Sequence, residues 1–338
     1  MKIGTTAIGT SEPPYVIAEV GINARDDLEL AEAHIDAAAE AGADAVKFQT
    51  HIPQAEMVQS EMEHLGHGDV FDVVAGNQFT KQEHKRLQSR CAEKDVNFLS
   101  TPFSTEAVEL LDDIGVPAIK IGSGELTNYP LLRKAAETGR PLLISTGMSD
   151  FETIQDTFDF IEPKASQVAL LYCVSAYPAD PDDMNLDTIS RMKDEFGVPI
   201  GFSDHSTGTR VSSVAMAKGA DFVEKHFTID RRLPGPDQAV SIEPEEMAEL
   251  AAFSETVQDT RGHEKEITQE EADVKLWARH SVVTTSPLSE GDVLSEKVMT
   301  TKRPGTGIPA EEFYSVVGRT LAKDLEENSI IHYSDLKE

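Results

Sequence analysis

Residues 199–228 read PIGFSDHSTGTRVSSVAMAKGADFVEKHFT, and this stretch contains the unit from which the fold is predicted. Two short apolar runs, 199–205 and 222–228, lie on either side of a segment with helical periodicity, and each run leads directly into a histidine, His205 or His226. Runs that are apolar on both faces are typical of parallel strands covered by helices. The stretch therefore predicts a strand, a helix and a second strand.

The same unit recurs throughout the first part of the chain. The clearest helix is 28–42, where Gly42 is placed to end a stripe formed by Leu28, Ala31, His34, Ile35 and Ala38. Eight strand–helix units before residue 260 predict a (β/α)8 TIM barrel. A doubly wound sheet is the alternative, but no GxGxxG motif follows the first strand. The other six strands are expected at 15–22, 44–50, 96–102, 118–124, 141–147 and 168–174.

The chain changes character after the barrel, which predicts three parts. Residues 1–260 form the TIM-barrel catalytic domain, and the polar segment 261–279 is a linker with some helix. Residues 280–338 have short β-like runs (281–288, 297–305, 314–325 and 329–336) broken by Gly, Pro and Ser, which fits a small β-rich domain. A long insertion between the second strand and its helix, 52–80, contains His64 and His67 and is interpreted as a substrate lid.

Composition and charge exclude several classes of protein. The chain has 338 residues, and 60 acidic against 30 basic side chains give a formal charge of -30, which argues against binding to nucleic acid or to an anionic membrane. Because the acidic residues are scattered along the chain, we expect a halophilic protein, with an ordinary acidic bacterial protein as the alternative. No early apolar run indicates a targeting segment, so we expect a cytoplasmic protein. Cys91 and Cys173 are expected to be buried reduced thiols.

Polar residues gather where the predicted strands end, and the active site of a TIM barrel is built at that edge. His205 and His226 then lie at adjacent strand ends, and two imidazoles in an oxygen-rich pocket suit a divalent transition metal. The alternative is a pair of core histidines without a metal. Polar residues at the other strand ends are Glu19, Asn23, Lys47, Gln49, His51, Ser100, Thr101, Ser104, Lys120, Ser123, Glu125, Ser145, Thr146, Ser175, Tyr177, Ser203, Asp204 and Lys225.

Lys47 and Lys120 come together with serine and threonine hydroxyls, a combination that cradles a phosphate or a carboxylate. The alternative for these lysines is a salt bridge with Glu19 or Glu125. Asp204 could orient the imidazole of His205 or could cap the following helix. The stiff turn LPGPD, residues 233–237, is predicted to hold Asp237 toward the pocket, although it could also be a simple surface turn.

Several motifs together resemble the sialic acid synthase family. They are IAEVGIN, VKFQTH, STPFS, KIGSGELTNYPLL, STGMS, the Tyr-Pro at 177–178, GFSDHS, EKHFTIDRRLPGPD and TKRPGTG, and they cover almost the whole chain in order. Members of that family join phosphoenolpyruvate to an N-acylated mannosamine or a related deoxy amino sugar. The resemblance implies a barrel followed by an antifreeze-like (SAF) domain, in a domain-swapped homodimer.

The resemblance also implies roles for single residues. His205 and His226 match the metal ligands, with manganese expected and magnesium or cobalt as alternatives. Glu19 matches the glutamate beside the reacting carbons, and Arg303 matches an arginine that the small domain delivers to the partner's site. Phosphoenolpyruvate-binding positions fall on Lys47, Thr101, Lys120, Ser123, Ser145 and Ser203, and sugar contacts fall on Gln49, Glu125, Tyr177 and Asp237.

Two positions depart from the family pattern. Ala24 stands where the first loop usually carries a histidine, which affects a contact of that loop. Ser175 stands near the position of an asparagine before the Tyr-Pro, which weakens one anion contact. Neither departure removes the histidine pair or the lysines.

The expected activity is that of a transferase in carbohydrate biosynthesis, with Glu19 or Glu125 as the base and the histidine-bound metal polarising the sugar aldehyde. An N-acetylneuraminate-type synthase is expected, and a legionaminate-type synthase that uses a 2,4-diacetamido-trideoxy hexose is an alternative. An aldolase that forms a Schiff base on Lys120 or Lys225 is another. A non-catalytic carbohydrate-binding protein is the third, but it explains neither the histidines nor the lysines.

Overall fold

The computed structural model describes residues 1–262 and 264–337, so His263 in the predicted linker and Glu338 lie outside the described residues. The chain divides into two units, Met1–Arg261 and Gly262–Glu338. Each unit has its own hydrophobic core and is described by itself.

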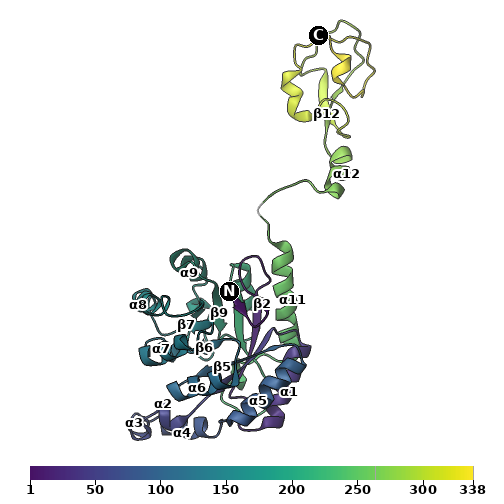
Figure 1. Ribbon diagram of the computed structural model, residues 1–338. Coiled ribbons are helices and arrows are strands. Elements are labelled where there is room, and N and C mark those ends of the chain that lie inside the picture. Colours follow the sequence, from purple (N-terminus) through teal and green to yellow (C-terminus); the bar gives the residue numbers. More distant parts are fainter. Residues whose placement is uncertain (263, 338) are drawn as a thin grey trace. The chain divides into compact units, whose positions relative to one another are not determined.

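Parallel strands form the centre of the first unit (Figure 1). Their order in the 8-stranded sheet is β5-β4-β3-β10-β9-β8-β7-β6, and β5 and β6, at the two ends of this order, contact each other. The sheet therefore curls into a nearly closed barrel, and the predicted TIM-barrel class is confirmed. The strands are β3 (Tyr15–Gly21), β4 (Ala45–Thr50), β5 (Asn97–Pro102), β6 (Ile119–Ile121), β7 (Leu142–Ser145), β8 (Val168–Cys173), β9 (Ile200–Asp204) and β10 (Phe222–His226).

Helices follow the strands and cover the outside of the barrel. In α1 (Leu28–Glu40), Ala31, His34, Ile35 and Ala38 are buried as the apolar stripe predicts. The chain leaves α1 through Gly42, whose φ of +87° is accessible to glycine at little cost. The other covering helices are α5 (Lys81–Glu93), α6 (Thr105–Ile114), α7 (Tyr129–Glu137), α8 (Phe151–Ile161), α9 (Thr188–Phe196), α10 (Arg210–Ala217) and α11 (Pro244–Thr260).

The amino-terminal end of the barrel is filled and closed. A hairpin of β1 (Lys2–Ile3) and β2 (Thr6–Ala7) precedes the barrel, and Ile3 and Ile8 belong to the same buried cluster as Tyr15 and Phe222. A Cβ atom on Gly201 would lie 2.5 Å from the Phe222 ring, which shows how tightly the interior is packed. The interior of the barrel is therefore packed at this end, and the cavity that the predicted site residues line lies at the carboxyl ends of the strands.

The insertion after β4 is helical rather than a long irregular loop. It contains α2 (Pro53–Glu56), α3 (Gln59–His64) and α4 (Gly68–Ala75), which are grouped together in Figure 1. Neither α3 nor α4 begins with a side-chain cap, and most residues of both helices are exposed. Weak local signals of this kind explain why the sequence pattern does not predict these helices.

The second unit consists of α12 (Gln269–Ala278) and the small C-terminal domain. There β11 (Ser281–Thr284) pairs antiparallel with β12 (Met299–Lys302). The predicted β-like runs at 314–325 and 329–336 contribute isolated bridges and short 3-10 turns instead of further strands. The core of this domain contains Val282, Leu294, Met299, Ile308, Val316, Leu321, Ile331 and Leu336.

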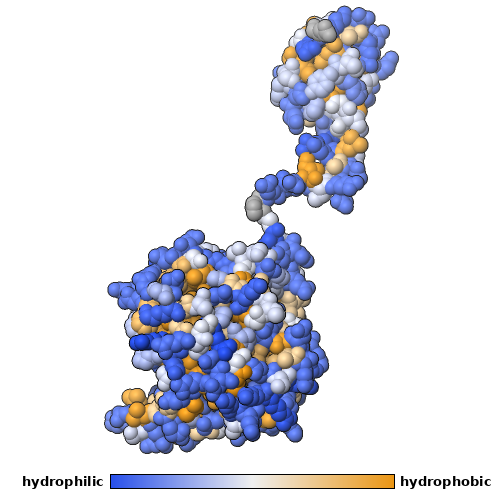
Figure 2. All heavy atoms as spheres, in the orientation of Figure 1, coloured by the Kyte–Doolittle hydropathy of each residue, from blue (hydrophilic) through white to orange (hydrophobic). Residues whose placement is uncertain are grey.

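Hydrophilic residues cover most of the visible face of the first unit (Figure 2). Among the described residues, no helix combines the length and the apolar character that a bilayer crossing requires. Cys91 and Cys173 are both buried and unpaired, as predicted.

Candidate functional site

The strand register brings the predicted residues to one edge of the barrel. It places His226 beside Glu19, Glu19 beside Lys47, and Gln49 beside Thr101. Because side chains alternate along a strand, these residues share the inward-facing parity. A cavity of about 330 Å³ opens there. The predicted residues that line it are Glu19, Lys47, Gln49, Thr101, Lys120, Ser123, Ser145, Tyr177, Ser203, His205 and His226.

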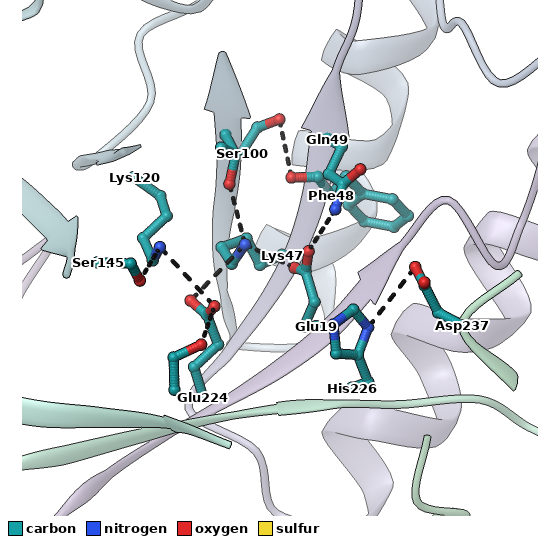
Figure 3. Close-up of polar contacts among 12 residues, drawn as sticks. Glu19, Lys47, Phe48, Gln49, Ser100, Lys120, Ser145, Glu224, His226 and Asp237 are labelled. Atoms are coloured by element: carbon teal, nitrogen blue, oxygen red, sulfur yellow. Dashed lines mark hydrogen bonds and ion pairs between the residues drawn. The ribbon is translucent and has the colours of Figure 1, made fainter. Parts of the chain in front are cut away.

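Lys47 is buried at the centre of a network of oxygen atoms (Figure 3). Its ammonium group lies 2.8 Å from Glu19 Oε2 and donates a hydrogen bond of 2.9 Å to Thr101 Oγ1. Glu224 Oε2 lies 3.6 Å away. The salt bridge with Glu19, expected from the sequence as the alternative to anion binding, is therefore present for Lys47, and both residues line the cavity.

Lys120 is as buried as Lys47, and it lies near the other carboxylate oxygen of Glu224. Its Nζ donates hydrogen bonds to Ser145 Oγ (2.7 Å) and to the carbonyl of Ile121 (3.0 Å), and it lies 3.8 Å from Glu224 Oε1. Ser203 donates a hydrogen bond of 3.1 Å to Glu224 Oε1. Glu224 is thus held between two ammonium groups, neither of which is close enough to form a short ion pair with it.

The charges of this network depend on burial. Burial raises the pKa of Glu19 to about 7, although Lys47 opposes the shift. Burial lowers the pKa of Lys120, while Glu224 opposes that shift. Burial would also lower the pKa of Lys47, but the two carboxylates hold it above its usual value. A carboxyl group whose pKa is close to neutrality is suited to accept and return a proton.

Glu224 is the functional residue that the sequence reasoning missed. It lies two residues before His226 in β10, so both side chains point into the barrel. Strand parity was the available signal, because a charged residue at an inward position of a buried strand needs a partner. Phe103, Met148 and Cys173 also line the cavity and were missed as site residues.

The two histidines lie close together at the mouth of the same cavity. Their ring centroids are 5.5 Å apart, and the rings are inclined by 48°. His205 Nδ1 lies 2.9 Å from the carbonyl of Val174, which fixes the ring and leaves Nε2 facing the Tyr177 hydroxyl at 3.1 Å. Tyr177 also stacks on the His205 ring, with centroids 4.1 Å apart.

His226 has an unsatisfied ring nitrogen. Its Nδ1 is buried and has no hydrogen-bond partner within the described part of the chain, and the nearest carboxylate oxygen, Asp237 Oδ2, is 3.7 Å away. Burial lowers the pKa of His226 well below its usual value, and the neighbouring His205 lowers it further. A neutral imidazole with a free nitrogen is the form that binds a metal.

These donors fit a divalent metal with two nitrogen ligands. No group of three His, Cys, Asp or Glu side chains in the described ranges is arranged to hold an ion. The remaining ligands would therefore come from water or from an oxygen atom of the substrate, which leaves open positions for chemistry.

Asp204 does not orient His205. It accepts hydrogen bonds from the Ser206 amide (2.7 Å) and from Ser212 Oγ (2.5 Å), and it forms a fully buried ion pair with Lys225 at 3.2 Å. The side chains of Asp204 in β9 and Lys225 in β10 point out of the barrel, away from the cavity. Lys225 is therefore not among the residues that line the cavity.

Gln49 connects Glu19 to His51, a histidine outside the pair formed by His205 and His226. Its amide nitrogen donates to Glu19 Oε1 (3.2 Å), and its amide oxygen lies 3.0 Å from His51 Nε2. His51 Nδ1 lies 2.9 Å from Glu56 Oε1 in α2. The helical insertion is therefore tied to the site through a buried chain of polar contacts.

The remaining predicted residues lie outside the main cavity. Glu125 accepts a hydrogen bond of 2.5 Å from the Asn128 amide and does not line the cavity, and Asp237 lines a neighbouring one. Arg303 belongs to the second unit, where its Nε donates to the carbonyl of Ala278. His64 and His67 are exposed on the insertion. Of the two departures, Ala24 is buried in the core and Ser175 lines the main cavity.

The model of the NeuB family matches residues 34–266, and the model of the SAF domain matches residues 279–337. Two curated relatives are similar over nearly their whole length. The N,N'-diacetyllegionaminic acid synthase of Legionella pneumophila is 33% identical over 97% of this chain and 96% of its own. The N-acetylneuraminate-9-phosphate synthase of Homo sapiens is 32% identical over 96% and 93%.

A solved structure shows the same similarity. The N-acetylneuraminic acid (sialic acid) synthetase from Leptospira borgpetersenii, in complex with citrate, has a TM-score of 0.74 and 36% identity, and the match covers 81% of this chain and 94% of that one. The family models and the curated relatives extend the similarity over both the barrel and the small domain, as the motifs predict. The chain therefore belongs to the NeuB family of sialic acid synthases and carries a C-terminal SAF domain.

Proposed function

We propose that this protein condenses phosphoenolpyruvate with an N-acyl amino sugar, N-acetylmannosamine or a relative of it, and releases phosphate. The observation that carries the proposal is the cavity in which Lys47 and Lys120 are both buried beside the pair of histidines, His205 and His226. Two ammonium groups in a water-poor site attract a dianionic or trianionic ligand strongly, because Coulomb attraction becomes stronger as the local dielectric constant falls. Phosphoenolpyruvate carries both a phosphate and a carboxylate for them to bind.

The electrostatic state of the cavity supports this assignment. Glu19 and Glu224 together offset the two lysines before the ligand binds, which limits the cost of burying positive charge. Once an anion enters, Lys47 and Lys120 can turn from the long contacts with Glu224 toward it. Thr101, Ser145 and Ser203 supply hydroxyl donors around the same space.

In the proposed reaction, C3 of the enol attacks the aldehyde carbon of the open-chain sugar, and a carbon–carbon bond forms. When bound at His205 and His226, a divalent metal, with manganese expected, would supply Lewis-acid polarisation of the aldehyde oxygen. Positive charge that develops at C2 is quenched by water, and Glu19 is placed to accept a proton from that water. Cleavage of the C2–O bond expels phosphate, which Lys47 and Lys120 hold.

One observation favours a second candidate, an aldolase that uses a Schiff base. Lys120 lines the cavity and has a lowered pKa, which is a property of nucleophilic lysines. Lys225 is less suited to that role, because it is fully buried in its ion pair with Asp204. Borohydride trapping separates the candidates, since an aldolase would be covalently labelled on Lys120 and a condensing synthase would not.

The proposed function is tested by phosphate release from phosphoenolpyruvate against a panel of amino sugars, with the product identified by mass. We expect release only when a sugar with a free aldehyde is present, and a product whose mass equals the sum of both substrates and water minus phosphate. Pyruvate consumption without phosphoenolpyruvate would instead identify the aldolase.

The metal is tested by chelation and substitution. We expect a chelator to abolish phosphate release and manganese to restore it. We expect His226→Ala to lose at least about a hundredfold in kcat/KM, the usual scale for removing a group that stabilises charge in the transition state. His64→Ala is the matched control, because this histidine is exposed and lines neither cavity. Undiminished turnover by His226→Ala in the presence of chelator would contradict the assignment.

Arg303 is proposed to act in the site of a second subunit of a domain-swapped homodimer. It lies in the TKRPGTG turn, where Pro304 restricts the backbone, and the residue is exposed. A rigid turn of this kind is suited to present one guanidinium to an anion or to the N-acyl group of the sugar.

Mixing two inactive chains tests this role. We expect heterodimers of Arg303→Ala and His205→Ala chains to regain one working site, because one barrel keeps both histidines and receives an intact arginine. The exposed Arg319 provides the control, since Arg319→Ala should leave the homodimer active. Heterodimers that form but stay inactive would rule out action in trans.

A further inference from the structure

A second cavity of about 350 Å³ adjoins the first at the carboxyl end of the barrel. The two cavities share Gln49, Tyr177 and His226 as lining residues. One side of the second cavity is formed by α4 of the insertion, and another by Pro236 and Asp237 of the stiff turn after β10. The junction of the cavities is therefore at the histidine to which the sugar aldehyde is assigned.

The lining of this second cavity is mostly apolar. Val70, Val73 and Val74 of α4 face it, together with Ile22 and Pro236. Val70 is 38% exposed and Val73 is 40% exposed, although both lie against a cavity that reaches a catalytic residue. Figure 2 shows hydrophobic residues gathered over this insertion, and a bound ligand would cover some of their surface.

The charged groups of the barrel that line the second cavity are carboxylates. Its ionisable lining residues other than His226 and Tyr177 are Asp69 and Asp237, and no lysine or arginine of the described residues lines it. The first cavity differs, because its two carboxylates, Glu19 and Glu224, are matched by two lysines, and several hydroxyl groups lie beside them. Away from His226, a phosphate in the second cavity would meet Asp69 and Asp237, and no lysine or arginine of the described barrel unit lines this wall to compensate them, which is unfavourable in a partly desolvated site.

We propose that the second cavity binds the carbon chain of the acceptor sugar beyond its aldehyde, and that it selects an acceptor without a phosphate at the far end. This inference rests on the proposed function. The new bond forms where the cavities meet, so phosphoenolpyruvate occupies the lysine side and the rest of the sugar continues into the other. Hydroxyl groups can donate to Asp69, Asp237 and Gln49, while carbon–hydrogen faces pack on the valines.

Sequence identity leaves open whether the acceptor sugar carries a phosphate. A synthase named for a 9-phosphate product and one named for an unphosphorylated product are almost equally similar to this chain. The carboxylates of the second cavity favour an acceptor sugar without a phosphate. A free hydroxymethyl group and a 6-deoxy methyl group both fit these contacts, whereas a 6-phosphate does not.

The experiment compares kcat/KM for N-acetylmannosamine and for its 6-phosphate, measured as phosphate release from phosphoenolpyruvate with manganese. We expect the unphosphorylated sugar to be preferred at least about tenfold, which corresponds to about 1.4 kcal/mol. We expect Val73→Lys to shift the ratio at least about tenfold toward the 6-phosphate, because it places a cation in the cavity wall. Val58→Lys is the matched control, since Val58 is exposed on the same insertion and lines neither cavity.

The outcomes separate this inference from the proposed function. Turnover with a preference for the 6-phosphate in the wild-type chain would overturn the inference and leave the proposed function intact. An equal shift in Val58→Lys and Val73→Lys would also overturn it, because the effect would then come from net charge alone. The absence of turnover with every sugar would overturn the proposed function, and this inference with it.

Discussion

The structure depends on the burial of Lys47 and Lys120 inside a barrel whose other end is closed by packing. Two ammonium groups out of water are tolerated because Glu19 and Glu224 lie within 4 Å of them and because serine and threonine hydroxyls accept their hydrogen bonds. Glu224 is 3.6 and 3.8 Å from the two lysines, so it stabilises their charge without consuming their donors. An anion that enters the cavity therefore finds positive charge that is already in place. This preorganisation is the physical basis of the proposed phosphoenolpyruvate site.

The barrel and most of its mouth could be predicted because they follow from strand periodicity. Once the strands are placed, parity decides which side chains point inward, and Lys47, Gln49, His205 and His226 all follow from that rule. The same rule would have found Glu224, but a glutamate beside Lys225 in the sequence resembles a surface ion pair. Glu125 was expected in the main cavity and lies outside its lining, because a 3-10 turn after β6 directs it toward Asn128.

The helices of the insertion could not be predicted for a different reason. Their apolar residues do not form a stripe that packs on the barrel core; Val70 and Val73 face a cavity instead. The three helices are also only 4, 6 and 8 residues long, which is shorter than the stretch of about 11–18 residues over which helical periodicity is recognised. The role proposed for Arg303 is likewise beyond what strand patterns can give, since it would depend on a second subunit.

The central claim is that phosphoenolpyruvate is held by the two lysines while its C2–O bond breaks. The most direct test uses phosphoenolpyruvate that carries a heavy oxygen isotope in the bridge between C2 and phosphorus, together with the amino sugar that the protein accepts. Cleavage at carbon predicts that the isotope leaves with the inorganic phosphate, and that a Lys120→Met chain releases little of it. Unlabelled phosphate would mean that the phosphorus–oxygen bond breaks instead, and would contradict the account.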